Sequence, residues 1–349
     1  MTTGTTSAPS PLSVSALDAT AHEAKPGILA RLMSDPLPSR HPWEGRFHLV
    51  MALSACVVAA ISLCGYYFFQ LTMSLPQALP LVLLLLLLLA GALQYRLRGE
   101  RKCFQVVMMV FWIIMVTNCH FFPMYMAARQ KVSLNDELLA RCDRALGFEV
   151  PDVLAAIEPY PGLGPFLLTI YMTLIPLMTL AAVLPPLFNR FDDSKRFIIG
   201  CIVAAAISLP IFACLQAVGP WDYYGFEPPI AALGGKEAML LNLKTDSLFV
   251  IDVSNRDGLI TFPSFHVVLT VLAAAALWPL RPLRWPVVLW ATLIVISTVA
   301  TGIHYSIDVL GGLAVAAIAF ASGYLYLQWE SGVWPRWSRR PKLQPAATS

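Results

Sequence analysis

Two histidines and an aspartate in the C-terminal third of the chain have the residue types and spacing for acid–base and nucleophilic chemistry. Residues 262–266 read Phe-Pro-Ser-Phe-His, and residues 304–308 read His-Tyr-Ser-Ile-Asp. The histidine of the second segment comes 38 positions after that of the first. Both segments lie at the ends of apolar runs long enough to cross a bilayer. Ionisable groups at membrane depth cost free energy and are kept mainly where they serve a site or a pathway. These three side chains therefore predict a functional site.

The spacing within the second segment favours phosphoryl transfer. If a helix begins near Tyr305, the carboxylate of Asp308 lies one turn from His304 and accepts its N–H, while the other ring nitrogen stays free to attack. His266 arrives from another helix and is the natural proton donor for a leaving oxygen. We therefore predict His304 as nucleophile, Asp308 as its orienting partner and His266 as general acid.

The residues before His266 suit the first turn of a helix. Proline is tolerated there, and the free backbone N–H groups of a helix N-terminus attract an anionic phosphate. Ser264 then either contacts the phosphate or caps the helix. A metal site built from the two histidines and the aspartate is the rival interpretation, but Asp308 is well placed to orient His304. We expect neither a metal ligand set nor a cofactor.

The elements that must position these residues are membrane helices. The chain is 57% hydrophobic and 13% charged, with a mean hydropathy of +0.66, which is typical of an integral membrane protein. Runs of about 20 apolar residues cross a bilayer. Eight such runs predict an all-α, polytopic helix bundle: 47–70, 77–95, 103–126, 162–188, 196–218, 262–280, 286–303 and 306–328.

The basic residues predict how the bundle is oriented. With a cytoplasmic N-terminus, seventeen Lys and Arg residues fall on the cytoplasmic face and seven on the opposite face, as the positive-inside rule requires. Both histidine segments then face outward, towards a periplasm or an organelle lumen. The domains expected are a disordered cytoplasmic tail over 1–46, a transmembrane catalytic domain over 47–330 and a basic cytoplasmic tail over 331–349. A net charge of +3 is too small to suggest a nucleic-acid partner.

Two outer loops, 127–161 and 219–261, are long enough to shape the site. In the first, Ser133 with Asp136 forms a possible capping box, and apolar residues recur every four positions until Gly147. This pattern predicts a short amphipathic helix that lies on the membrane or packs over the bundle. The second loop directly precedes Pro263 and is expected to cover the site.

Pro-Ser-x-His followed by His-x-x-x-Asp resembles the second and third motifs of the type 2 phosphatidic acid phosphatase superfamily. The resemblance covers about residues 255–325 and implies a six-span catalytic core with an outward-facing site. It also implies a phosphohistidine on the histidine of the third motif. By position, His304 is this nucleophile, Asp308 orients it, and His266 is the general acid.

Departures from the superfamily pattern favour one branch of it. Ser297 stands where the third motif begins, but Thr298 replaces the arginine that most members have next. The first motif, a lysine followed by Arg-Pro, is not found upstream of His266, and Phe265 replaces a glycine. The third motif is similar to that of inositol phosphorylceramide synthases and sphingomyelin synthases, which have the form His-Tyr-x-Ile-Asp.

That branch moves a phospho-alcohol headgroup from a glycerophospholipid to a lipid hydroxyl. A phosphodiester carries one negative charge, so one cation suffices, and Arg256 is the candidate, although it could instead pair with a neighbouring aspartate. We expect Ser264, Arg256, Ser297 and Tyr305 to line the substrate site. The expected partners are a glycerophospholipid donor, a lipid-alcohol acceptor and the bilayer. The alternatives are a lipid phosphate phosphatase and, more remotely, a transporter with a histidine proton relay.

The charge distribution makes a prediction about topology. Cysteines introduced at Gly225 and Gly258 should react with a membrane-impermeant thiol reagent applied from outside, and cysteines at Asp193 and Pro282 should not. Labelling of the unsubstituted chain gives the background from its seven cysteines. The opposite labelling pattern would overturn the orientation.

Overall fold

The computed structural model describes residues 45–226, 235–245, 247–251 and 258–331. All of them lie within one compact unit, Pro36–Ser349. The two predicted tails, 1–46 and 331–349, fall almost entirely outside the described residues.

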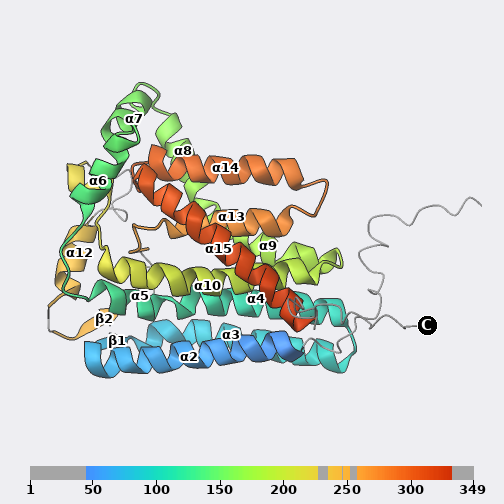
Figure 1. Ribbon diagram of the computed structural model, residues 1–349. Coiled ribbons are helices and arrows are strands. Elements are labelled where there is room, and N and C mark those ends of the chain that lie inside the picture. The colour runs from blue at the N-terminus through green and yellow to red at the C-terminus, as the bar shows by residue number, and fades with distance from the viewer. Residues whose placement is uncertain (1–44, 227–234, 246, 252–257, 332–349) are drawn as a thin grey trace, which may run out of the picture. The chain divides into compact units, whose positions relative to one another are not determined.

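The described chain is a helix bundle, which confirms the all-α prediction (Figure 1). Each of the eight predicted apolar runs coincides with one helix or with two helices in series. These helices are α2 (Gly45–Phe69), α3 (Leu75–Leu97), α4 (Arg101–Cys119), α5 (Phe121–Ala128), α8 (Leu163–Met172), α9 (Leu174–Leu187), α10 (Phe191–Cys214), α13 (Phe265–Leu277), α14 (Arg284–Ala300) and α15 (Ser306–Glu330).

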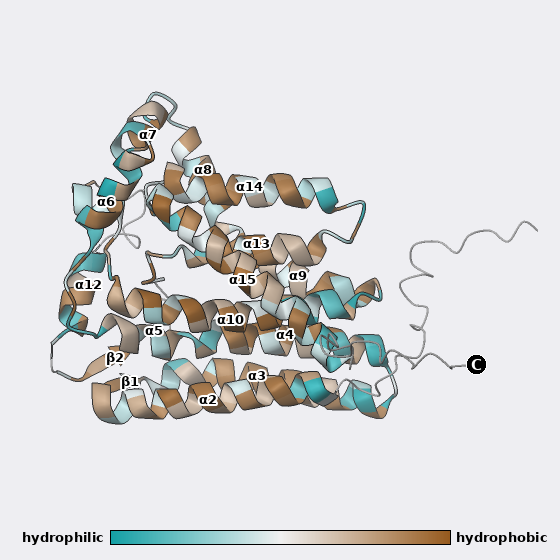
Figure 2. Cartoon of the chain, viewed as in Figure 1, coloured by the Kyte–Doolittle hydropathy of each residue, from teal (hydrophilic) through white to brown (hydrophobic). Residues whose placement is uncertain are grey.

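Within the described ranges, six helical segments are long and apolar enough to cross a membrane, with α4–α5 and α8–α9 each counted as one segment. The chain is therefore a multi-pass integral membrane protein. The predicted spans over α13 and α14 are apolar helices of 13 and 17 residues, which at 1.5 Å per residue reach only about 20 and 26 Å. Figure 2 shows apolar residues along the bundle and polar residues gathered at its two ends.

Proline explains why two of the spanning segments are interrupted. α4 ends at Cys119 and α8 ends at Met172, each four residues before a proline, Pro123 and Pro176. Proline has no N–H to donate to the carbonyl four residues earlier, so the helical hydrogen-bond ladder breaks there.

The helix that carries His266 lies in the middle of the bundle. α13 packs against α9, α10, α14 and α15, and eight of its thirteen residues are buried. A helix surrounded on all sides is apolar all round, which explains the uniformly apolar sequence that follows His266.

α15 approaches the start of α13 unusually closely. A Cβ atom on Gly312 would lie 2.7 Å from the backbone oxygen of Ser264, and one on Gly311 would lie 2.8 Å from the ring of Phe262. Only glycine permits this approach, and it brings the 262–266 and 304–308 segments together.

Short elements cover the end of the bundle at which α13 and α15 begin (Figure 1). They are α6 (Asp136–Ala145), α7 (Val150–Ile157), α11 (Pro220–Tyr224), α12 (Lys236–Leu243), β1 (Leu71–Met73) and β2 (Phe249–Ile251). β1 and β2 pair in parallel, with Leu71 opposite Phe249. No pattern in the sequence indicated this two-stranded ribbon.

The close contact at Gly312 predicts the effect of adding one methyl group. Gly312→Ala forces a Cβ against a backbone carbonyl that has no room to move, and overpacking of this kind costs about 1–3 kcal/mol. Thermal unfolding in detergent should show a lower Tm. Gly91→Ala is the matched control, because a Cβ at Gly91 in α3 meets nothing within 4 Å. An equal Tm for the two variants would contradict the close-packing argument.

Candidate active site

His304 and Asp308 lie within hydrogen-bonding distance in a buried position. Nδ1 of His304 is 3.3 Å from Oδ2 of Asp308 and 3.1 Å from the backbone oxygen of Thr261. The Asp308 side chain is fully buried, and only 4% of His304 is exposed. α14 ends at Ala300 and α15 begins at Ser306, so a turn separates the last two predicted apolar runs and carries His304.

These contacts define which nitrogen of His304 carries the proton. A carbonyl and a carboxylate only accept hydrogen bonds, so Nδ1 must be the donor in the neutral ring. Nε2 then holds a lone pair, and no hydrogen bond to it is found among the described residues. His304 therefore has its Nδ1 fixed by Thr261 and Asp308 and its Nε2 left with a lone pair.

His266 is held by a different helix pair. Its Nε2 lies 2.9 Å from the backbone oxygen of Tyr171 on α8, and its ring stacks on that of Tyr171 with 3.9 Å between centroids. Because the carbonyl accepts, Nε2 carries a proton in this arrangement. A protonated ring would then present Nδ1–H as a second donor, which is the form a general acid requires.

Backbone hydrogen bonds join the two segments. The amide of Ser264 donates to the backbone oxygen of Asp308 at 3.0 Å and so links the first segment to the second. The amide of His304 donates to the backbone oxygen of Thr298 at 3.0 Å and so ties the second segment to the end of α14. The turn between Thr298 and His304 passes through Gly302, whose φ of +72° is easily reached only by glycine.

Three of the four predicted substrate-lining residues have defined places. Ser264 caps α13 and accepts a 3.4 Å bond from the amide of Val267. The hydroxyl of Ser297 donates to Ile294 within α14. Tyr305 is buried, and its hydroxyl donates to Asp136 at 3.0 Å. Arg256 lies outside the described residues.

α6 is anchored by two buried carboxylates that the sequence analysis did not single out as site residues. Asp143 accepts from the amides of Ser306 and Ile307 at 2.8 and 2.7 Å. It thus satisfies the first turn of α15, directly after His304. A negative side chain at a helix N-terminus is stabilising, and here it comes from a residue more than 160 positions away.

Asp136 fixes the other side of this arrangement. Its two oxygens accept from the amides of Val218 and Gly219 at 3.0 and 2.9 Å. The predicted capping box with Ser133 is wrong: α6 begins after Asn135, and no side chain caps it. The Asp136 side chain instead accepts hydrogen bonds from the backbone of Val218 and Gly219. The buried face of α6 consists of Asp136, Leu139, Ala140 and Asp143. Burial raises the pKa of both Asp136 and Asp143, and the backbone N–H donors oppose that rise.

A lysine of the second outer loop, Lys236, acts on the site through its charge. Asp222 of α11 accepts from the amides of Gly235 and Glu237, and so holds the start of α12. α11 in turn contacts the turn before His304, because Trp221 lies 3.3 Å from where a Cβ of Gly302 would be. Burial, together with the positive charges of Lys236 and then His266, holds the pKa of His304 well below its usual range. Lys236 is therefore close enough to act on His304 electrostatically.

Lys236 was not recognised from the sequence. The signal was weak, since it is one of several basic residues in a 43-residue loop and belongs to no motif. The described residues contain no group of three or more His, Cys, Asp or Glu side chains placed to hold a metal ion.

A comparison with protein families gives one match. The model of the PAP2 superfamily matches residues 137–322, just over half of the chain. The chain belongs to the PAP2 superfamily. No curated protein and no solved structure matched it. The matched range includes α6, α12 and both histidine segments. The superfamily comprises phosphatases and phosphotransferases, so this PAP2 protein is a membrane enzyme of that general kind.

The low pKa of His304 predicts how activity depends on pH. The ring must be neutral to attack, so activity should persist below pH 6.5, the ordinary value for histidine. Lys236→Gln removes a positive charge that disfavours the imidazolium, so the pKa of His304 should rise and the acid limb of kcat/KM should move to higher pH. Lys236→Arg should keep the original limb. Lys102→Gln, at the start of α4, is the control for loss of one charge. An unmoved acid limb in Lys236→Gln would show that Lys236 does not act on His304.

Proposed function

We propose that this PAP2 protein is a lipid phosphotransferase of the inositol phosphorylceramide synthase type. It would move a phospho-alcohol headgroup, such as phosphoinositol, from a glycerophospholipid to a lipid alcohol through a phosphohistidine. The observation that carries the proposal is the pairing of Nδ1 of His304 with the oxygens of Thr261 and Asp308, which leaves Nε2 to attack.

In the first step, the lone pair on Nε2 of His304 attacks the phosphorus of the donor phosphodiester. A P–N bond forms and the P–O bond to diacylglycerol breaks. The departing oxygen takes a proton from His266, and Asp308 accepts the Nδ1–H of the ring, which is cationic once Nε2 is phosphorylated.

In the second step, the acceptor hydroxyl attacks the same phosphorus. It gives its proton to His266, the P–N bond breaks, and Nε2 regains its lone pair. The product is a new phosphodiester lipid, and the enzyme returns to its starting protonation state.

The cations available to the site favour a diester over a monoester. A phosphomonoester carries up to two charges and is held best by several guanidinium or ammonium donors. Thr298 occupies the position of the usual arginine, and its backbone oxygen binds the amide of His304. Lys236 supplies a positive charge near His304, which suits the single charge of a diester. Arg256 remains a second candidate cation.

The environment of His304 disfavours water as the acceptor. His304 is buried, and α6 and α11 contact the residues on either side of it. Limited access for water suppresses hydrolysis of a reactive intermediate. The charge distribution supports an orientation in which this end of the bundle faces the outer side of the membrane and both termini are cytoplasmic.

The proposal predicts dependence on an acceptor. Purified protein should consume phosphatidylinositol slowly alone and faster when ceramide or diacylglycerol is added, with formation of a new phosphodiester lipid.

His304→Ala should abolish both turnover and any acid-labile phosphoenzyme. His266→Ala should slow turnover by about 10²–10⁴-fold, the usual contribution of a general acid.

Two results would count against the proposal. Full activity of His304→Ala would remove the nucleophile assignment. Rapid release of inorganic phosphate from phosphatidic acid or a polyprenyl phosphate, without dependence on an acceptor, would replace the transferase with a phosphatase.

A further inference from the structure

Residues around the junction of α2 and β1 line two separate cavities. One, of about 540 Å³, is lined by Phe68, Phe69, Gln70, Arg129, Gln130, Lys131, Lys244 and Thr245; we call it the basic pocket. The other, of about 610 Å³, is lined mainly by apolar residues of α2, α3, α4, α5 and the β1–β2 ribbon; we call it the apolar cavity. Neither is lined by His266, His304 or Asp308.

The basic pocket contains a buried cation with an unused donor. Arg129 is only 9% exposed. Its Nη2 donates to the backbone oxygen of Ser247 at 2.7 Å, but its buried Nη1 has no hydrogen-bond partner. A buried charged N–H without an acceptor is costly, so an anionic oxygen in the pocket would be stabilised.

Two further cations surround this donor. Lys244 donates to the backbone oxygen of Val132 at 2.7 Å, and burial lowers its pKa. Lys131 lines the same pocket, and none of the described residues that line this pocket is acidic. Several ammonium and guanidinium donors around one space are the usual environment of a phosphate.

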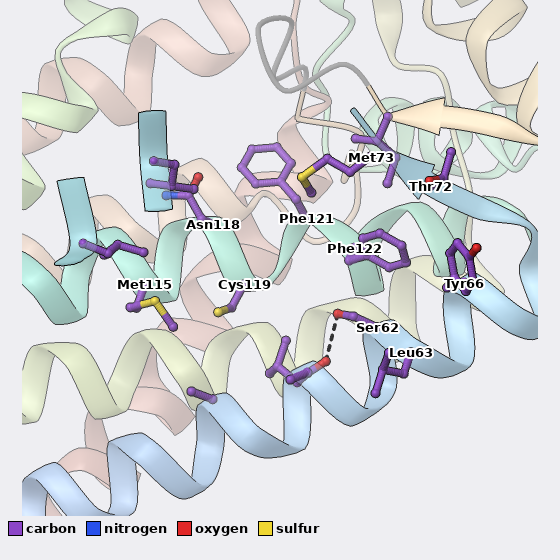
Figure 3. Close-up of a pocket in the computed structure, with 16 residues that line it drawn as sticks. Ser62, Leu63, Tyr66, Thr72, Met73, Met115, Asn118, Cys119, Phe121 and Phe122 are labelled. Carbon is purple, nitrogen blue, oxygen red and sulfur yellow. Dashed lines mark hydrogen bonds between the residues drawn. The ribbon is translucent and has the colours of Figure 1, made fainter. Parts of the chain in front are cut away.

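The apolar cavity offers little to a polar ligand (Figure 3). The hydroxyl of Ser62 donates to the backbone oxygen of Val58, and the amide nitrogen of Asn118 donates to that of Ile114. The remaining lining is mostly aliphatic, aromatic and sulfur-containing side chains. It lies between helices long enough to cross a membrane, where the available occupant is a hydrocarbon chain.

Neighbouring residues of the same segments line the two cavities. Tyr66 and Thr72 line the apolar cavity, whereas the intervening Phe68, Phe69 and Gln70 line the basic pocket. On α5, Phe122 lines the apolar cavity, and Arg129 follows seven residues later, about 10 Å along a helix at 1.5 Å per residue. That separation suits the phosphate and the upper acyl chain of one phospholipid.

Most of these walls come from a part of the chain that the superfamily match does not include. α2, α3, α4 and α5 all precede residue 137, where the match begins. The helices before the matched region thus build most of the apolar cavity, and α2 ends at the end of the bundle where α15 begins (Figure 1).

We propose that the two cavities together bind one anionic phospholipid, with its phosphate beside Arg129 in the basic pocket and one acyl chain in the apolar cavity. This lipid site is separate from the site of His304.

Binding by the purified full chain in detergent tests the proposal, with native mass spectrometry and thermal shift as readouts. Phosphatidylglycerol should remain bound and raise the Tm, and phosphatidylcholine and inorganic phosphate should do neither. Arg129→Gln should weaken phosphatidylglycerol binding about tenfold or more. Lys131→Gln combined with Lys244→Gln tests the same pocket if the Arg129 variant does not fold. Arg141→Gln, an exposed arginine of α6, is the control for lost charge.

A second pair of variants tests the apolar half without changing charge. Ala59→Phe fills the apolar cavity and should weaken phosphatidylglycerol binding, whereas Ala60→Phe, on the next residue of α2 and outside the cavity lining, should not.

Equal binding of phosphatidylcholine and phosphatidylglycerol would overturn the proposal. Equal losses of phosphatidylglycerol binding in Arg129→Gln and Arg141→Gln would also overturn it. A Tm increase from inorganic phosphate alone that matches phosphatidylglycerol would make the pocket an ion site and overturn the lipid assignment. Asp246 lies outside the described residues. If phosphatidylglycerol binds only to the Asp246→Asn variant, the chain itself supplies the anion for Arg129, and the lipid proposal is overturned.

Discussion

The contact between the start of α15 and the start of α13 is the constraint on which the site depends. Gly312 lets the two backbones approach until a Cβ would clash with Ser264, and the amide of Ser264 then donates to the backbone oxygen of Asp308. At this depth a polar group must find its partner within the protein, since water is scarce. The same contact therefore packs the helices and sets the position of the carboxylate that orients His304.

The outer elements extend this constraint. Asp143 satisfies the first amides of α15, and Asp136 binds the hydroxyl of Tyr305. α11 contacts the turn at Gly302 and holds α12 through Asp222. These short helices thus hold the loop that carries His304 from the outside, while α13 holds it from within the bundle. A site held from both sides keeps its geometry at low cost during turnover, which is what preorganised catalysis requires.

The helices before residue 137 have a different relation to the rest of the chain. α2 and α3 are largely exposed to the surroundings of the bundle, and they meet the catalytic region mainly through α4 and α5. Their cavities contain an unused arginine donor at one end and apolar side chains at the other. This separation of charge from hydrocarbon-facing surface matches the two parts of a phospholipid, and it is the physical basis for assigning them a lipid of their own.

The sequence by itself determined the properties that depend on local pattern. Apolar runs of about 20 residues gave the membrane helices. The four-residue spacing of His304 and Asp308 gave their contact, because an acidic side chain in the first turn of α15 reaches back to the residues just before the helix. Only the tertiary structure decided which distant groups complete the site. Four groups come to the site from distant parts of the chain: Thr261 beside Nδ1 of His304, Tyr171 beside His266, Asp143 at the start of α15, and Lys236 near His304. The first three lie 43 to 163 residues from their partners. Lys236 lies in a loop without a periodic pattern. From the sequence, the acidic residues of α6 are indistinguishable from an ordinary solvent-exposed polar face. Their hydrogen bonds go to backbone amides far away in the chain, and the spacing of neighbouring residues does not indicate such bonds.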